Sequence, residues 1–323
     1  MKKKRSLKLR KIFAFLGFNL VFAAVLSPFI VFWGPFQSLK ELAVGSIATS
    51  RHPWVLDPFL SKSEVSKIMD LTDKQGVDAN AKTIAHTDVT NASSGITIEN
   101  IQGPNFKGKV MLIQDPKRVK VAVTKQIGVT GERVTDLVRD SGAIAGINAG
   151  GFYDPNGKGN GAFPDGLTVH NGVLVHNNVG NTTVNIVGFN NQGKLIIGDM
   201  RASQLAENHI MEAVTFGPNL IVNGQPQIHG DGGWGIAPRT GIGQTADGTV
   251  IFVVIDGRQP MWSIGATLRD LMNVFESFHA VNAVNLDGGS SSELVYNGKI
   301  ENKLWDIFGE RYIPTAFVVT AQQ

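Results

Sequence analysis

Residues 281–292 read VNAVNLDGGSSS, an apolar run that ends in an aspartate, two glycines and three serines. The run from Val281 to Leu286 has the composition of a buried β-strand. Asp287 then stands at the mouth of that strand, where a rigid backbone can hold a carboxylate in place. The glycines that follow allow backbone N–H groups to come close to a ligand. This segment therefore predicts a strand end that takes part in binding or catalysis.

Two further apolar runs end in the same way. The strand predicted over 143–147 runs into NAGGFYD (148–154), and the strand predicted over 250–255 runs into DGR (256–258). A single Asp-Gly after a strand is most often a plain turn. Three such ends, together with PRTGIG (238–243) ahead of another strand, favour a common site.

Short β-rich runs divided by glycine-containing turns dominate the chain from about residue 109. The strongest strand candidates are 110–113, 119–123, 144–147, 184–187, 195–197, 250–255 and 281–286. Helical patterns are fewer. The best one begins at Thr267 as N-cap, and a weaker one covers 133–141. Many strands and few helices in no strict alternation predict an α+β fold, a mixed β-sheet domain.

The N-terminal segment predicts one transmembrane helix ahead of this domain. Residues 12–33 carry no charge, and a helix of this length reaches about 33 Å, enough for a hydrocarbon core of roughly 30 Å. Residues 1–11 hold seven basic side chains and no acidic one, so this tail should stay in the cytoplasm. Residues 34–105 are expected to form a linker with a short helix that starts at Ser61-Lys62-Ser63-Glu64, and 106–323 the domain proper. A cleaved signal peptide is the alternative to the anchor.

Composition limits the classes of partner and cofactor. The 323 residues include 30 basic and 27 acidic ones, and seven of the basic ones lie in the N-terminal tail. The remaining chain has no bulk basicity, which argues against nucleic acid as a partner. No cysteine is present, which excludes disulfides, thiolate metal sites and cysteine nucleophiles.

Histidine spacing does not favour a zinc site. Apart from calcium, we expect neither a metal ion nor another cofactor. His229, which precedes the glycine-rich GDGG (230–233), is the histidine best placed for a ligand contact. The loop 154–160, DPNGKGN, spaces its oxygen ligands somewhat as a calcium loop does but lacks the glutamate at the twelfth position. Calcium is therefore the one cofactor left open, against a solvated glycine loop.

From about residue 109 onward the chain resembles the phosphodiester glycosidase family. The matching stretches are INAGGF (147–152), FGP (216–218) with NG (223–224), PRTGIG (238–243), VIDGR (254–258) and AVNLDGGSSS (283–292). Each is weak alone, but their order, with the Thr267 helix directly before the last, is fairly specific. Two features depart from the family pattern. Ser290 stands where a third glycine is common, and the connection 153–165 is longer than usual, which leaves substrate size open.

The resemblance implies hydrolysis of the bond between a sugar C1 and the oxygen of a phosphate ester. That reaction builds oxocarbenium character on the sugar and negative charge on the phosphate, so it needs a carboxylate on one side and cations or N–H groups on the other. The catalytic candidates are Asp287, Asp256 and Asn148. The substrate-binding candidates are Arg239 for the phosphate, Thr240, Gly288, Gly289, Ser290, Ser291, Gly150 and His229.

These roles have structural alternatives. Asp287 and Asp256 could be turn carboxylates that cap neighbouring N–H groups, and Arg239 could be the buried ion-pair partner of one of them. Arg258 ranks second as a ligand because a turn arginine is more often exposed to solvent.

We therefore expect an extracytoplasmic glycosidase anchored by a single span in the cell membrane. Its partners would be the lipid bilayer and a sugar-phosphate or cell-envelope glycan, for example in exopolysaccharide metabolism. One alternative is a non-catalytic polysaccharide-binding or assembly module that keeps the pocket without turnover. The other is a phosphodiesterase that cuts the P–O bond instead of the C–O bond.

Overall fold

The computed structural model describes residues 2–77, 85–86, 95–306 and 308–322. Within these ranges it has five α-helices and three antiparallel β-sheets. The α+β class predicted from the sequence is confirmed. Met1 of the predicted tail and two stretches of the predicted linker, 78–84 and 87–94, lie outside the described residues.

The spatial order of the strands in each sheet differs from their order along the chain. The seven-stranded sheet consists, from edge to edge, of β12 (Gln225–Pro226), β11 (Asn219–Val222), β15 (Ala280–Leu286), β13 (Arg239–Thr245), β14 (Val250–Ile255), β3 (Lys107–Ile113) and β2 (Ile96–Gln102). The six-stranded sheet consists of β1 (Ala85–His86), β9 (Leu195–Met200), β8 (Val184–Asn190), β10 (Ile210–Thr215), β6 (Leu167–His170) and β7 (Val173–Asn177). The five-stranded sheet consists of β17 (Lys299–Ile300), β16 (Leu294–Tyr296), β5 (Ala143–Asn148), β18 (Thr315–Thr320) and β4 (Val119–Val123).

The helices are few. They are α1 (Lys2–Trp33), α2 (Gln37–Ala48), α3 (Lys62–Gly76), α4 (Val134–Asp140) and α5 (Leu268–Ser277). The short 3₁₀ helices are η1 (Pro53–Leu56), η3 (Pro116–Arg118), η4 (Pro155–Gly157), η5 (Ala202–Gln204) and η6 (Gly289–Ser291).

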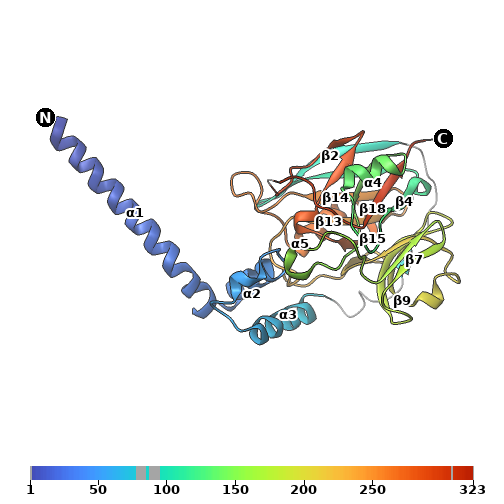
Figure 1. Cartoon of the computed structure of the whole chain (residues 1–323), viewed down its shortest axis with the longest axis horizontal. Coiled ribbons are helices and arrows are strands. Elements are labelled where there is room, and N and C mark those ends of the chain that lie inside the picture. The colour runs from blue at the N-terminus through green and yellow to red at the C-terminus, as the bar shows by residue number, and fades with distance from the viewer. Residues whose placement is uncertain (1, 78–84, 87–94, 307, 323) are drawn as a thin grey trace.

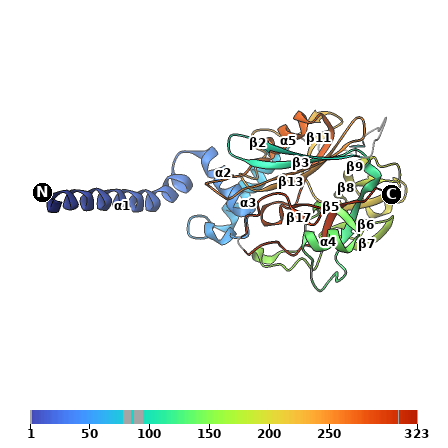
Figure 2. The same cartoon turned by 90° about the horizontal axis from the view of Figure 1, so that it is seen from above.

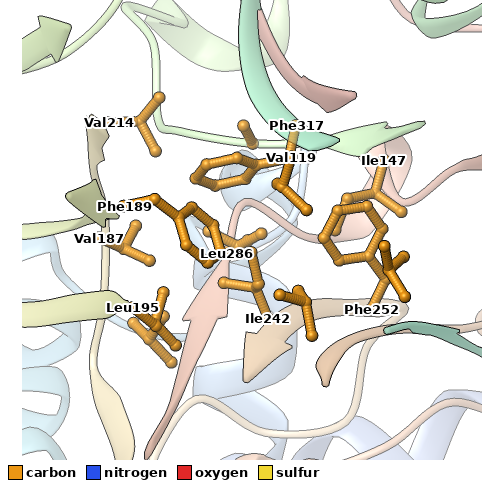
Figure 3. Packing of buried hydrophobic residues seen from close by; sticks show 14 of the residues in the cluster. Val119, Ile147, Val187, Phe189, Leu195, Val214, Ile242, Phe252, Leu286 and Phe317 are labelled. Carbon is orange, nitrogen blue, oxygen red and sulfur yellow. The ribbon is translucent and has the colours of Figure 1, made fainter. Parts of the chain in front are cut away.

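The inner faces of the three sheets share one hydrophobic core (Figure 3). Phe252 comes from the seven-stranded sheet, Phe189 from the six-stranded sheet, and Ile147 and Phe317 from the five-stranded sheet. The rings of Phe189 and Phe317 meet edge to face, with their centroids 6.3 Å apart. Burial of apolar surface is the dominant favourable term in folding, so this shared core holds the sheets together.

Helix α5 covers the outer face of the seven-stranded sheet. It begins where the sequence predicts, because Thr267 forms a capping box in which its hydroxyl accepts a hydrogen bond from the Asp270 N–H. Phe275 on the inner face of α5 is fully buried against the glycines of β13. A Cβ atom at Gly241 would lie only 2.8 Å from the Phe275 ring, so the strand needs glycine there.

The N-terminal helices form a separate arm. Helix α1 extends away from the sheets, and α2 and α3 lie between it and the sheets (Figures 1 and 2). The capping box predicted at Ser61 is present, since the Glu64 N–H donates to the Ser61 hydroxyl. The predicted linker contains more structure than the sequence suggested, namely α2 and the edge strand β2.

Helix α2 docks on a glycine-rich loop of the domain, residues 229–236. The Ile236 N–H donates to the Ser46 hydroxyl at 2.8 Å. A Cβ atom at Gly45 would lie 2.7 Å from the Gly233 carbonyl oxygen, which leaves no room for a side chain. The arm is therefore fixed to the domain by close backbone packing.

The packing of Phe275 gives a stability prediction. Phe275→Ala should lower the free energy of unfolding by about 3–5 kcal/mol, because it opens a cavity between α5 and β13. Urea denaturation followed by circular dichroism measures this change. Phe163→Ala, at an exposed position, should change it by about 0.5 kcal/mol or less. Equal losses in the two variants would contradict the packing described.

Candidate active site

The start of β13 and the ends of β14 and β15 lie side by side at one end of the strands of the seven-stranded sheet. Strand β13 starts at Arg239, which lies opposite Ile255 at the end of β14, while Thr240 lies opposite Leu286 at the end of β15. The next residues along the chain, Asp256 and Asp287, therefore leave the sheet on the two sides of the start of β13. The arrangement follows from antiparallel pairing, because a central strand starts where both of its neighbours end.

Glycines allow both loops to approach Pro238, which precedes β13. A Cβ atom at Gly257 would lie 2.6 Å from the Pro238 nitrogen, and one at Gly288 would lie 2.9 Å from the Pro238 oxygen. The Gly289 N–H donates to that same oxygen at 2.9 Å. The glycine after each aspartate is thus required by contact with a neighbouring backbone.

Asn148, at the end of β5, connects the five-stranded sheet to these strand ends. Its Oδ1 accepts hydrogen bonds from the Thr240 hydroxyl at 2.8 Å and from the Glu293 N–H at 3.1 Å, and its Nδ2 donates to the Asp287 carbonyl oxygen. The side chain is almost completely buried. The structure therefore brings together Asn148, Thr240 and Asp287, as the sequence predicted, with the Asn148 amide bound to protein groups.

The Asp287 carboxyl group is partly buried. The residue as a whole retains some exposure, but its Oδ2 atom is buried and has no hydrogen-bond partner among the described residues. Loss of hydration raises the pKa of Asp287 to about 6, and the charge of Asp154 acts in the same direction. The Ser291 hydroxyl and the charge of Arg311 oppose this shift. A carboxylic acid with such a pKa changes its charge near neutral pH, as groups that transfer protons do.

Two arginines lie next to this carboxyl group. Burial lowers the pKa of Arg258 to about 10 and the charge of Arg311 adds to this effect, whereas the charge of Asp287 opposes it. The Arg258 Nη2 atom is buried and has no hydrogen-bond partner among the residues that the structure describes. Arg311 forms an ion pair with Asp154 at 2.5 Å and donates to the Ser290 hydroxyl at 3.2 Å. The site thus combines two guanidinium groups with two carboxyl groups.

The N-terminal arm reaches the rim of this charged group. The Arg258 guanidinium carbon lies 5.4 Å from the centroid of Trp305, and the centroid of the His52 ring lies 6.3 Å from that of Trp305. Arg51 pairs with Asp306 at 3.0 Å and donates to the Gly157 carbonyl at 2.7 Å. The stretch of the arm that follows α2 is therefore attached to two of the loops that surround Asp287.

Asp256 is held by several hydrogen bonds. Its Oδ2 accepts from the Trp262 indole N–H at 2.7 Å, and its Oδ1 accepts from the Lys303 N–H at 2.9 Å and the Asn302 amide at 3.2 Å. The residue is buried. These donors belong to two different loops, so the carboxylate of Asp256 fastens the loops to the end of β14.

Arg239 is also engaged by the protein. Its guanidinium donates to the carbonyl oxygens of Ala266, Trp234 and Gly235 at 3.1, 3.2 and 2.7 Å. Burial lowers its pKa to about 10. Within the described part of the chain Arg239 forms no ion pair with an aspartate, which was the alternative that the sequence left open. Instead, the side chain holds the loop that leads into β13.

The remaining candidates divide between two places. Gly150 lies in the loop after β5, where its N–H donates to the Thr315 hydroxyl at 3.2 Å, and Ser291 lies in η6 beside Asp287. His229 lines a cavity of about 450 Å³ that Glu41 and Thr72 of the N-terminal helices also line. His229 therefore lies on the side of its loop that faces the arm.

Glu293 is a titratable group that sequence reasoning missed. Its side chain is buried, and its N–H donates to Asn148. Burial is the largest cause that raises the pKa of Glu293 to about 10, and a hydrogen bond with Glu310 and the charge of Glu310 act in the same direction. Glu310 is fixed by Thr135, whose N–H and hydroxyl both donate to it. Glu293 therefore carries a proton at neutral pH.

Arg311 and Asp154 were not assigned from the sequence either. Asp154 is the last residue of NAGGFYD (148–154), so a polar strand end in the sequence pointed to its neighbourhood. Arg311 lies in a loop with no comparable pattern. Among the described residues no group of three or more His, Asp or Glu side chains is placed to hold a metal ion.

Comparison with known proteins gives a consistent family signal. A model of the phosphodiester glycosidase family matches residues 141–320. The SPbeta prophage-derived uncharacterized protein YomE of Bacillus subtilis (strain 168) is 29% identical over 184 residues, which cover 54% of this chain and 28% of YomE. The chain thus spans little more than a quarter of that relative.

Two solved structures share the fold. One is the catalytic domain of zebrafish N-acetylglucosamine-1-phosphodiester alpha-N-acetylglucosaminidase, auto-inhibited by its pro-peptide, with a TM-score of 0.61 and 21% identity. The match covers 74% of this chain and 89% of that one. The other is a protein of Burkholderia pseudomallei K96243 described as exported, with a TM-score of 0.51, 18% identity and coverage of 67% and 74%.

The buried proton of Glu293 gives a prediction about stability and pH. Between pH 4.5 and about 10 the folded protein retains this proton while the unfolded chain releases it, so this group's contribution to stability decreases as pH rises. The slope is at most about 1.4 kcal/mol per pH unit. Glu293→Gln should remove it and so be more stable than the unaltered protein at pH 9, with a smaller difference at pH 5.

Thermal unfolding at a series of pH values measures this effect. The matched control is Glu207→Gln, at an exposed position. If Glu293→Gln follows the same pH profile as Glu207→Gln, Glu293 is not protonated in the folded protein.

Proposed function

Because the chain belongs to the phosphodiester glycosidase family, we propose that it hydrolyses glycosyl phosphodiesters at the bond between the sugar C1 and the phosphate oxygen. The observation that carries this proposal is the partly buried Asp287 carboxyl group flanked by the guanidinium groups of Arg258 and Arg311. It pairs an anionic group for the sugar with cationic groups for the phosphate, which are the two requirements of the reaction.

The phosphate side of the site is assigned to the arginines. Arg258 has a buried N–H group without a partner in the described part of the chain, and Arg311 is held in a fixed orientation by Asp154 and Ser290. A guanidinium fork matches two oxygens of a phosphate group. In this proposal the hydroxyls of Ser290 and Ser291 form the second part of this cradle, whereas the Gly289 N–H is occupied by the Pro238 carbonyl oxygen and Gly288 packs against it.

The sugar side is assigned to Asp287. When the C1–O bond breaks, the phosphate monoester leaves with the bonding electrons as a stable anion, so the leaving group needs little help from an acid. Water supplies the new C1–OH group and loses a proton. Asp287 assists either by accepting that proton or by bonding to C1 first, and both roles need the ionised carboxylate.

The other predicted site residues receive positioning roles. Asn148 ties β5 to the Asp287 backbone, Asp256 fastens the loops beside Arg258, and Arg239 shapes the loop before β13. In this proposal the phosphate contact predicted for Arg239 passes to Arg258. Thr240 supports Asn148, and His229 remains a candidate for contact with a distant part of the substrate.

The proposal includes a membrane anchor. Residues Lys11–Trp33 form a helical stretch that is long and apolar enough to cross a bilayer, and the helix stands free of the domain in Figures 1 and 2. Basic residues precede this stretch, so the domain would lie outside the cell membrane. Since α2 follows α1 after three residues and docks on the domain, the site would stay close to the membrane surface, where cell-envelope glycans are found.

Replacement of the Asp287 carboxyl group tests catalysis. Asp287→Asn should lower kcat for sugar release from a sugar-1-phosphodiester by about 10³-fold or more, because the base or nucleophile is lost. Substrate binding should change little. Release of free sugar from a panel of such diesters is the measurement.

The contrasting variant is Asp256→Asn. It weakens loop anchoring and should reduce kcat by about tenfold or less, together with a lower melting temperature. If the unaltered protein binds the diesters but releases no sugar from any of them, it is a binding module and the proposal fails.

The pKa of Asp287 predicts the pH dependence of activity. Because the carboxylate is the active form and its pKa in the folded protein is about 6, kcat/KM should fall about tenfold for each pH unit below 6 and level off above pH 7. Initial rates between pH 4 and 8 give the profile. A rate that increases as pH falls from 7 to 5 would assign Asp287 the opposite role, that of an acid.

A further inference from the structure

A groove lined by lysines lies next to the candidate site on the outer side of the Asp256 loop. Its volume is about 520 Å³, and we call it the lysine groove, after Lys107 and Lys109 of β3 and Lys303. Trp262, Asn302 and two acidic residues, Asp256 and Glu301, also line it. No family stretch recognised in the sequence covers the three lysines.

Two of the ammonium groups are held over an aromatic ring. The Nζ atoms of Lys107 and Lys303 lie 4.1 and 5.1 Å from the centroid of Trp262, within the range of cation–π attraction. The indole is itself fixed by its N–H bond to Asp256. Two flexible side chains, one from strand β3 and one from the loop after β17, thereby lie next to the same ring.

These ammonium groups lack an acidic partner. Among the described residues, no carboxylate lies within ion-pairing distance of Lys107 or Lys303, and Lys109 is 3.9 Å from Glu301. Asp256 already accepts three hydrogen bonds and has little capacity left for a lysine. Each free ammonium group has up to three N–H donors for an anionic ligand.

The shape of the groove suits an extended ligand. A smaller cavity of about 180 Å³ adjoins the groove, and Gln102, Lys107 and Trp262 line both cavities. Asn100 and Gln102 of β2 add amide groups that can bind hydroxyls. The combined space exceeds what an inorganic anion fills and lies in the range of sites for larger ligands.

The groove is connected to the candidate site by one side chain. The Nδ2 of Asn302 donates to the Asp256 carboxylate and to the Ser292 carbonyl oxygen, both at 3.2 Å. Ser292 follows directly on η6, which borders Asp287. The groove lining is therefore hydrogen-bonded to the segment that follows Asp287.

We propose that the lysine groove binds an anionic glycan, so that the substrate is a polymer with repeated phosphate or carboxylate groups, of which a small sugar-1-phosphodiester represents only the reacting linkage. Lys107 and Lys303 contact the negative groups, and the amides of β2 and Asn302 contact sugar hydroxyls. This assignment of substrate class rests on the proposed hydrolysis at Asp287, whereas binding in the groove does not depend on turnover.

The test uses the full chain in detergent micelles with two probes of equal length, dextran phosphate and unmodified dextran. The unaltered protein should bind dextran phosphate more tightly than dextran, and the double variant Lys107→Gln, Lys303→Gln should bind dextran phosphate about tenfold or more weakly. The matched control is Lys62→Gln, Lys117→Gln, which removes the same charge from exposed positions and should bind as the unaltered protein does. Hydrolysis of a small sugar-1-phosphodiester should be the same in all three proteins.

Several results would overturn the groove assignment. These are equal binding of the two dextrans, an equal loss in the control variant, or unchanged binding in the groove variant. A different pattern separates the two proposals: if dextran phosphate binds through Lys107 and Lys303 but no diester is hydrolysed, the groove assignment stands and the proposed reaction fails.

Discussion

The start of β13 lies between the ends of β14 and β15, and the candidate site depends on this arrangement. Pro238 is in contact with the backbone on both sides, so Gly257 and Gly288 have no space for a side chain. This close approach fixes the two loops that carry Asp256 and Asp287. Asn148 then connects the five-stranded sheet to the same strand ends. The hydrophobic core that the three sheets share supports these strand ends.

Burial of charge gives the site its chemical properties. Arg258 and Arg311 offset the charges of Asp287 and Asp154, which makes it possible to bury four ionisable groups in part. At Glu293, burial and the neighbouring Glu310 outweigh the charge of Arg133, so this carboxyl group remains protonated. Of Asp287, Arg258 and Glu293, Asp287 has the pKa closest to neutral pH, and the proposed reaction needs its carboxyl group in the ionised form.

Local patterns in the sequence predict much of the fold and part of the site. The capping residues Thr267 and Ser61 mark helix starts correctly because the capping bond depends on residues three apart. The polar ends of apolar runs single out Asp287 and Asn148, which the structure places next to each other at the ends of β15 and β5. Strand β2 was missed although Ile96, Ile98 and Ile101 show part of an alternating pattern, because the surrounding segment is polar.

The remaining parts of the site depend on contacts between distant segments. Arg311 and Glu293 lie near Asp287 and Asn148 through the packing of the folded chain, so no spacing in the sequence indicates them. Arg239 has the residue type of a phosphate ligand, but nearby carbonyl oxygens occupy its guanidinium group. Residue type alone could not show whether this guanidinium group is free to bind a phosphate or is occupied by carbonyl oxygens of the protein.

Hydrolysis in oxygen-18 water tests the central claim most directly, which is cleavage between the sugar C1 and the phosphate oxygen. Mass spectrometry of the two products shows where the label enters. The account predicts one labelled oxygen in the released sugar and none in the phosphate monoester. Label in the phosphate would mean that the P–O bond is cut, and would contradict the role assigned to Asp287 at the sugar.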